Sequence, residues 1–196
     1  MAIEVPFQVE FDIPHGVELT PAESANIMKL VGVRYASFMK RRFDTFSQGG
    51  GDWKPLAKST LRARDRKVKK SKKKKTQAEA VVANHSILVD TGTLRGALNI
   101  GATGTGDGAE LVTNVNPQES SVTMRFTGKI HPPPKDGKKK KDCKGLTIAA
   151  LAAIQHYGSQ ERNIPARPIL VEPNAEQMGK LEDLIRRQVK KAYETR

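Results

Sequence analysis

The sequence has a single cysteine, Cys143, and lacks any apolar run of about 18 residues. One cysteine cannot form an internal disulfide, which is typical of a chain that stays in a reducing compartment. Without a long apolar run, no segment is expected to cross a membrane. The first eleven residues contain Glu4 and Glu10 and no basic stretch followed by an apolar one, so we expect no signal peptide and a soluble, cytoplasmic chain.

Residues that build catalytic and metal sites are also scarce. The four histidines are scattered without the HxH or HExxH spacing of a zinc site, and Cys143 has no CxxC partner. The glycine-rich stretch 101–108 lacks the Gly-Lys-Ser/Thr ending of a phosphate-binding loop, and it is interpreted as a hairpin turn between two strands. We therefore expect no catalytic residues, no metal, no cofactor and no enzymatic activity.

Positive charge is what the chain has in excess, because 34 Lys and Arg against 21 Asp and Glu give a net charge of +13. Residues 58–75 hold eleven basic residues against one acidic residue, and residues 135–144 hold six against two. These segments contribute +10 and +4, which leaves the rest of the chain near −1. We expect two mobile, lysine-rich insertions, at about 66–80 and 129–145, because such tracts cannot bury apolar surface.

The lysines of these insertions are candidate contacts to DNA or to an acidic protein surface. Lysines release counterions from a polyanion, which gives affinity without sequence preference. The tracts contain no interleaved aromatic residues, so base stacking is not predicted. The candidates are Lys69, Lys70, Lys72, Lys73, Lys74, Lys75, Lys138, Lys139, Lys140 and Lys141.

The hydrophobic pattern predicts one α+β domain over residues 1–196. Alternating apolar residues over 5–13 predict a strand, and Pro6 favours a sheet edge for it. Thr20-Pro21-Ala22-Glu23 is typical of a helix start, and the apolar stripe that follows predicts a long helix ending before Gly49.

The rest of the chain completes this pattern. Strands are predicted from Leu98 to the glycine-rich stretch, at 110–115 and at 121–127, in an antiparallel meander. Helices are predicted at 146–157 and from about 173 to 196, and the prolines of the 164–170 segment between them predict an extended backbone. The result is a small antiparallel sheet packed with two long helices.

Two single residues have competing interpretations. Trp53, the only tryptophan, could stack on a base, but beside Pro55 and Leu56 it is favoured as a pin that holds a loop to the body. Arg167 could make an inter-subunit ion pair or a bidentate contact, or it could be an exposed arginine at the end of a strand.

Four short motifs follow one another over residues 51–170. They are Gly51-Asp52-Trp53-Lys54-Pro55-Leu56 with Thr60, Ile87-Leu88-Val89-Asp90-Thr91-Gly92-Thr93-Leu94-Arg95, Ile154-Gln155-His156-Tyr157-Gly158, and Ile164-Pro165-Ala166-Arg167-Pro168-Ile169-Leu170. In this order they resemble the phage virion morphogenesis family, the Mu-type tail-completion and neck proteins of tailed bacteriophages. The chain departs from the family pattern at Ile169, where phenylalanine is frequent, and at Gly96-Ala97, where a serine is frequent.

The resemblance implies a structural virion protein of the neck, the head-tail connector region. Such proteins form rings, commonly six-fold, that complete the neck or tail and allow head-tail joining around the DNA channel. The implied partners are further copies of the chain, neighbouring neck, connector or tail-terminator proteins, and the packaged DNA. The implied location is the virion, with assembly in the host cytoplasm. The implied assembly residues are Trp53, Pro55, Leu56, Asp90, Thr91, Gly92, Leu94, Arg95, His156, Gly158, Pro165, Arg167 and Pro168.

A second hypothesis remains open beside this one. The chain could be a free nucleic-acid-binding protein without sequence specificity, of ribosomal or chromatin type, that acts through its lysine-rich insertions.

Overall fold

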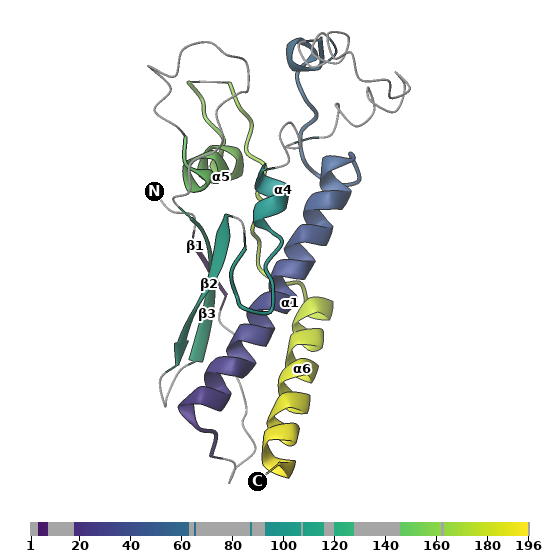
Figure 1. Ribbon diagram of the computed structural model, residues 1–196. Coiled ribbons are helices and arrows are strands. Elements are labelled where there is room, and N and C mark those ends of the chain that lie inside the picture. Colours follow the sequence, from purple (N-terminus) through teal and green to yellow (C-terminus); the bar gives the residue numbers. More distant parts are fainter. Residues whose placement is uncertain are drawn as a thin grey trace, which may run out of the picture.

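The computed structural model describes residues 4–7, 18–62, 65, 87, 93–106, 108–115, 120–127, 146–161 and 163–195. The fold is α+β, as predicted. Helix α1 (Pro21–Ser47) runs diagonally through an elongated body, with a three-stranded sheet on one side and helix α6 (Ala175–Glu194) on the other (Figure 1). Helices α4 (Thr93–Ala97) and α5 (Ile148–Tyr157) lie in the half of the body that contains the end of α1 (Figure 1).

Helix α1 begins where the sequence predicts. The Thr20 hydroxyl accepts from the Glu23 main-chain N–H, the Glu23 carboxylate accepts from the Thr20 main-chain N–H, and Pro21 occupies the first turn. This reciprocal pair satisfies N–H groups that a helix start otherwise leaves without partners. The predicted stripe is buried at Ile27, Val31, Tyr35, Met39 and Phe43, and Phe46 packs against it half-buried.

The sheet has the order β1-β3-β2 and is antiparallel throughout. Its strands are β1 (Glu4–Phe7), β2 (Ala109–Val115) and β3 (Ser120–Phe126). The antiparallel pairing of β2 with β3 and the edge position of the strand that holds Pro6 confirm those two predictions. Of the strand predicted over 5–13, residues 8–13 lie outside the described residues. Along β3 every second side chain is buried, at Val122, Met124 and Phe126, so one face of the sheet covers the core.

Glycine at position 32 allows the sheet to approach α1 closely. A Cβ at Gly32 would lie 2.8 Å from Leu111 Cδ1 on β2 and 2.8 Å from Val122 Cγ2 on β3. On another side of α1, the Tyr35 hydroxyl donates to the Val171 carbonyl at 2.9 Å, just before α6. Helix α1 therefore lies between the sheet and α6, and it forms the centre of the core.

The predicted strand that begins at Leu98 is wrong. The segment continues the buried side of α4 instead, since Leu94, Ala97 and Leu98 are all buried and follow the helical spacing of three and four residues. A turn closes behind them, with the Asn99 N–H donating to the Gly96 carbonyl at 3.0 Å.

The glycine-rich stretch therefore joins α4 to β2, and the prediction that it connects two strands is wrong. Within it the Gly104 N–H donates to the Gly101 carbonyl at 2.9 Å, and Leu111 N–H donates to the Gly104 carbonyl at 2.8 Å. Gly104 has φ +82°, a backbone conformation that favours glycine.

The two remaining helices have the predicted places. Thr147 caps α5 by accepting from the Ala150 N–H at 3.1 Å, and α6 starts after Asn174, which makes a reciprocal cap with Gln177. The apolar stripe of α6 is buried at Leu181, Ile185 and Val189. No helix among the described residues combines the length and apolarity needed to span a membrane.

Candidate functional site

Trp53 joins the loop after α1 to the end of that helix and to the segment that contains Pro168. Its side chain is only 5% exposed and meets Phe43 and Phe46 edge to face, with ring centroids 5.3 Å and 5.5 Å away. The indole Nε1–H donates to the Pro168 carbonyl at 3.2 Å. A buried indole needs a partner for its N–H, and this one finds it in a residue 115 positions later. The predicted role of Trp53 as a pin is confirmed.

Arg167 lies beside it and is buried, with 4% of its surface exposed. Its guanidinium donates from Nε to the Lys54 carbonyl at 3.1 Å and from Nη2 to the Pro55 carbonyl at 3.5 Å, and its own N–H donates to the Gln155 carbonyl at 2.8 Å. The interpretation of Arg167 as an exposed arginine at a strand end is wrong. The extended segment around it turns inward, against the loop that follows α1, because that loop offers main-chain acceptors to the guanidinium.

The Pro168 carbonyl accepts a second donor, Nη1 of Arg42 on α1. The Arg42 guanidinium also lies over the Phe46 ring, 4.3 Å from its centroid, and 5.9 Å from the centroid of Trp53. Burial lowers the pKa of Arg42, and the charge of Asp52 opposes that shift. Sequence analysis missed Arg42, although its position seven residues after Tyr35 places it on the apolar stripe of α1, where a charged residue needs a partner.

His156, at the end of α5, acts here as a hydrogen-bond acceptor. Its Nδ1 faces the main-chain N–H groups of Ile169 at 3.1 Å and of Leu170 at 3.5 Å. Both residues are buried, so the imidazole supplies a partner that their N–H groups would otherwise lack. Burial, and secondarily the charge of Arg42, lower the pKa of His156, which favours the neutral ring that this contact requires.

Gly158 ends α5 and starts the extended segment. Its φ of +79° and ψ of −178° suit glycine, and a Cβ there would lie 2.7 Å from the Ile164 carbonyl oxygen and 2.8 Å from the Ala166 nitrogen. The chain then turns back through paired hydrogen bonds between Ser159 and Ile164, at 2.8 and 2.9 Å. This short hairpin brings the prolines and Arg167 back toward α1.

Arg42, Trp53, His156, Arg167 and Pro168 together are called the Trp53 junction below. It brings together three of the four motifs that the sequence analysis selected. Within these motifs, Leu56 and Pro165 are half-buried and Pro55 is exposed. The polar side chains of the junction bind main-chain carbonyls and N–H groups, so the contacts fix backbone geometry.

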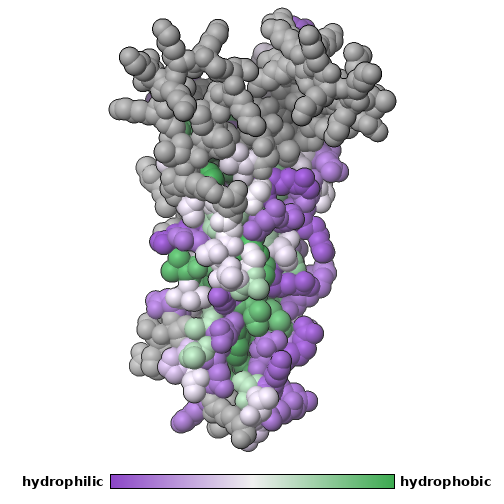
Figure 2. All heavy atoms as spheres, viewed as in Figure 1, coloured by the Kyte–Doolittle hydropathy of each residue, from purple (hydrophilic) through white to green (hydrophobic). Residues whose placement is uncertain are grey.

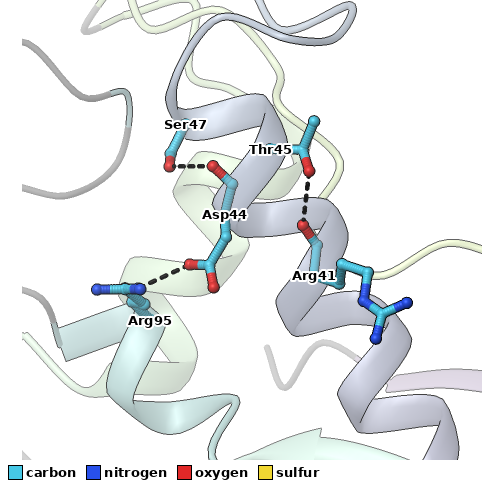
Figure 3. A network of polar contacts seen from close by, with 5 residues as sticks. All are labelled: Arg41, Asp44, Thr45, Ser47 and Arg95. Atoms are coloured by element: carbon cyan, nitrogen blue, oxygen red, sulfur yellow. Dashed lines mark hydrogen bonds and ion pairs between the residues drawn. The ribbon is translucent and has the colours of Figure 1, made fainter.

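The fourth motif reaches α1 from the side of α4. Leu94 is buried, and the Arg95 Nε lies 2.7 Å from the Asp44 carboxylate on α1, while the Ser47 hydroxyl donates to the Asp44 carbonyl (Figure 3). The ion pair is partly exposed, at 52% and 31% for the two side chains, so it contributes at most about 1 kcal/mol. The other predicted residues lie outside the described ranges, namely Asp90, Thr91 and Gly92 and all ten candidate lysines.

Within the described ranges, no three His, Cys, Asp or Glu side chains come together in a way that could hold a metal ion. A scan against protein-family models, a search of curated proteins and a search of solved structures each found no match.

Proposed function

We propose that the chain is a structural subunit of the neck of a tailed bacteriophage. In this proposal it forms a ring, commonly six-fold in such proteins, that completes the neck or tail and allows head and tail to join around the DNA channel. Its partners are further copies of itself, the neighbouring neck, connector or tail-terminator proteins and the packaged DNA. The proposal starts from the resemblance of four ordered motifs to the virion morphogenesis family.

The observation that carries the proposal is the way these motifs meet. Trp53 and Pro168 are 115 positions apart and share a hydrogen bond, and His156 and Arg167 complete the same junction. Their polar atoms hold main-chain groups, which fixes the angle between the end of α1 and the extended segment. A closed ring repeats one contact at one angle, so its subunit needs this kind of fixed geometry.

The extended segment also suits a contact with a neighbouring copy. Its prolines limit the conformations of the free chain, so less entropy is lost when it is ordered against a partner. Tyr157, 64% exposed, is the last residue of α5, seven residues before this segment, and it is an aromatic side chain of the kind that often anchors interfaces.

The test is the assembly state of the purified chain, measured by native mass spectrometry and negative-stain microscopy. Rings of a single stoichiometry, alone or on addition of a neighbouring neck protein, are the expected result. The second measurement is mass spectrometry of purified particles of the phage that encodes the chain, where its peptides are expected in a fixed ratio to other neck components. A chain that is absent from purified particles refutes the proposal.

The second candidate function is that of a free nucleic-acid-binding protein without sequence specificity. The two lysine-rich segments favour it, since they contribute +10 and +4 to the charge of the chain. A monomer that binds duplex DNA with a steep salt dependence, and that stays monomeric with every neck partner, would favour this function over the first.

A further inference from the structure

One side of α1 faces solvent along its whole length. Its exposed positions follow the helical spacing and include Leu30, Arg34, Ser37, Arg41 and Thr45. Two half-buried lysines, Lys29 and Lys40, flank this row. The α1 basic face is defined here as Lys29, Arg34, Lys40 and Arg41.

Among the ion pairs between described residues, none involves Lys29, Arg34, Lys40 or Arg41. Residues 24–62 contain eight basic residues and two acidic ones, a charge of +6, and both acidic residues face other arginines. Asp44 pairs with Arg95, and the charge of Asp52 acts on Arg42. Figure 3 shows the Arg41 guanidinium pointing away from the Asp44–Arg95 pair.

The near-zero net charge of the chain outside the two lysine-rich segments conceals a basic stretch that includes α1. Outside the two lysine-rich segments the chain sums to about −1, yet residues 24–57 alone hold six basic and two acidic residues, or +4. The rest of the chain outside the lysine-rich segments then sums to about −5, so the excess positive charge of the body is concentrated in residues 24–57. Figure 2 shows hydrophilic residues covering the side of the body along α1 and α6, with apolar residues nearer the middle of the view.

The composition of the face distinguishes between a protein and a nucleic acid as its partner. Protein interfaces are built around buried aromatic and aliphatic anchors and are depleted of lysine at their centre. Leu30, 38% exposed, is the only large exposed apolar residue on the described part of α1, while Tyr157 and Tyr193, both 64% exposed, lie on other elements. Arg34 is also held in place, with its guanidinium 5.1 Å from the centroid of the Phe38 ring.

We propose that the α1 basic face binds the phosphate backbone of duplex DNA without sequence preference. Arg34 and Arg41 are seven residues apart, which is about 10.5 Å along the helix and matches about three base-pair steps of 3.4 Å. The place of this face on the DNA channel rests on the proposed function, but the binding itself does not. Helix α1, and not the lysine-rich segments alone, then contacts DNA.

The test uses the full chain with the double substitution Arg34→Gln and Arg41→Gln. The matched control is Arg186→Gln with Lys191→Gln, which removes two exposed cations from α6. Binding to a fluorescein-labelled duplex of about 30 base pairs is followed by anisotropy between about 50 and 200 mM salt. Circular dichroism melting checks that each variant is folded.

Loss of two phosphate contacts is expected to reduce the salt slope by about 1.8, so the change in Kd over that fourfold salt range becomes about 12-fold smaller. The α6 control is expected to keep the wild-type slope. Equal salt slopes in all three proteins overturn the proposal, because Arg34 and Arg41 would then contact no phosphate. An equal reduction in both variants also overturns it, because only the net charge of the chain, and not the position of the two arginines, would then affect binding. A wild-type chain that binds no duplex at the lowest salt also overturns it.

Native mass spectrometry of the same samples separates this proposal from the proposed function. A reduced slope in the α1 variant supports the DNA-binding face whether or not the chain forms rings. Rings that bind DNA with a slope independent of Arg34 and Arg41 would support the ring subunit and refute the face.

Discussion

Arg167→Met tests whether the Trp53 junction stabilises the chain by itself, without a neighbouring copy. Methionine keeps much of the aliphatic length of arginine and fills a similar space, but it removes the guanidinium that holds the Lys54 and Pro55 carbonyls. Those carbonyls belong to the residues directly after Trp53, so the loop that carries the indole should loosen.

The expected size of the effect follows from the geometry. A hydrogen bond from a charged donor contributes about 1.5–3 kcal/mol. The Nε contact at 3.1 Å has ordinary length, whereas the Nη2 contact at 3.5 Å is at the limit and adds little. Removing a buried charge also returns part of its desolvation cost. We expect the free energy of unfolding to fall by about 1–3 kcal/mol, a large share of the roughly 5–15 kcal/mol typical of a domain.

Urea unfolding followed by fluorescence measures this directly, because Trp53 is the only tryptophan. The variant is expected to have a lower midpoint and, before unfolding, a red-shifted emission maximum as water reaches the indole. Arg186→Met, at an exposed position of α6, is the control and should change neither value. A loss below about 0.5 kcal/mol with unchanged emission would refute the reasoning and return Arg167 to the inter-subunit role.

Three further predictions concern backbone space and protonation. Gly158→Ala should lower the free energy of unfolding in urea by more than about 2 kcal/mol, since its φ of +79° strains an alanine. The control Gly179→Ala, in open space on α6, should leave that free energy unchanged or raise it by up to about 1 kcal/mol. Equal effects of the two substitutions would contradict this. Gly32→Leu should cost about 1–3 kcal/mol because the sheet leaves no room for a side chain, and a melting temperature like that of the wild type would show that the contact with Leu111 yields. Folding lowers the pKa of His156, so the stability that the neutral ring contributes is present above about pH 6.5 and is lost as the pH falls from there toward the folded pKa. Between pH 7.5 and 5 the melting temperature should therefore fall more for the wild type than for His156→Asn, which keeps an acceptor but does not titrate. Parallel plots of melting temperature against pH for the two proteins would refute this.

The parts of the fold that sequence predicts well depend on signals within one turn of helix or one strand. The Thr20 cap, with Glu23 three residues later, marks the start of α1 without reference to any other element. The alternation along β3 and the glycine at position 158 are equally local. For the same reason, the ends of α1 and α5 and the pairing of β2 with β3 could be predicted closely.

The parts that were missed depend on residues far away in the chain. Arg167 is buried because the carbonyls of Lys54 and Pro55, over 110 positions earlier, accept hydrogen bonds from its guanidinium. No residue near Arg167 in the sequence indicates these partners. The segment at Leu98 has the alternation of a strand, but its buried residues continue the helical spacing of α4, as Leu94, Ala97 and Leu98 show. Short apolar runs fit both periods, and only packing decides between them.

The arrangement of the site follows from the phase of α1. Gly32 faces the sheet, Tyr35 and Arg42 are seven residues apart and hold the segment before α6, and Arg34 and Arg41 are each one residue earlier and face solvent. One residue corresponds to a rotation of about 100°, so the junction and the basic face are adjacent sides of one rigid helix. A neighbour that contacts the extended segment therefore fixes the direction of the basic face as well. The sheet contact at Gly32 prevents α1 from rotating to uncouple the two sides. If the chain forms a ring, the same geometry that sets its closing angle also sets which side of α1 faces the channel.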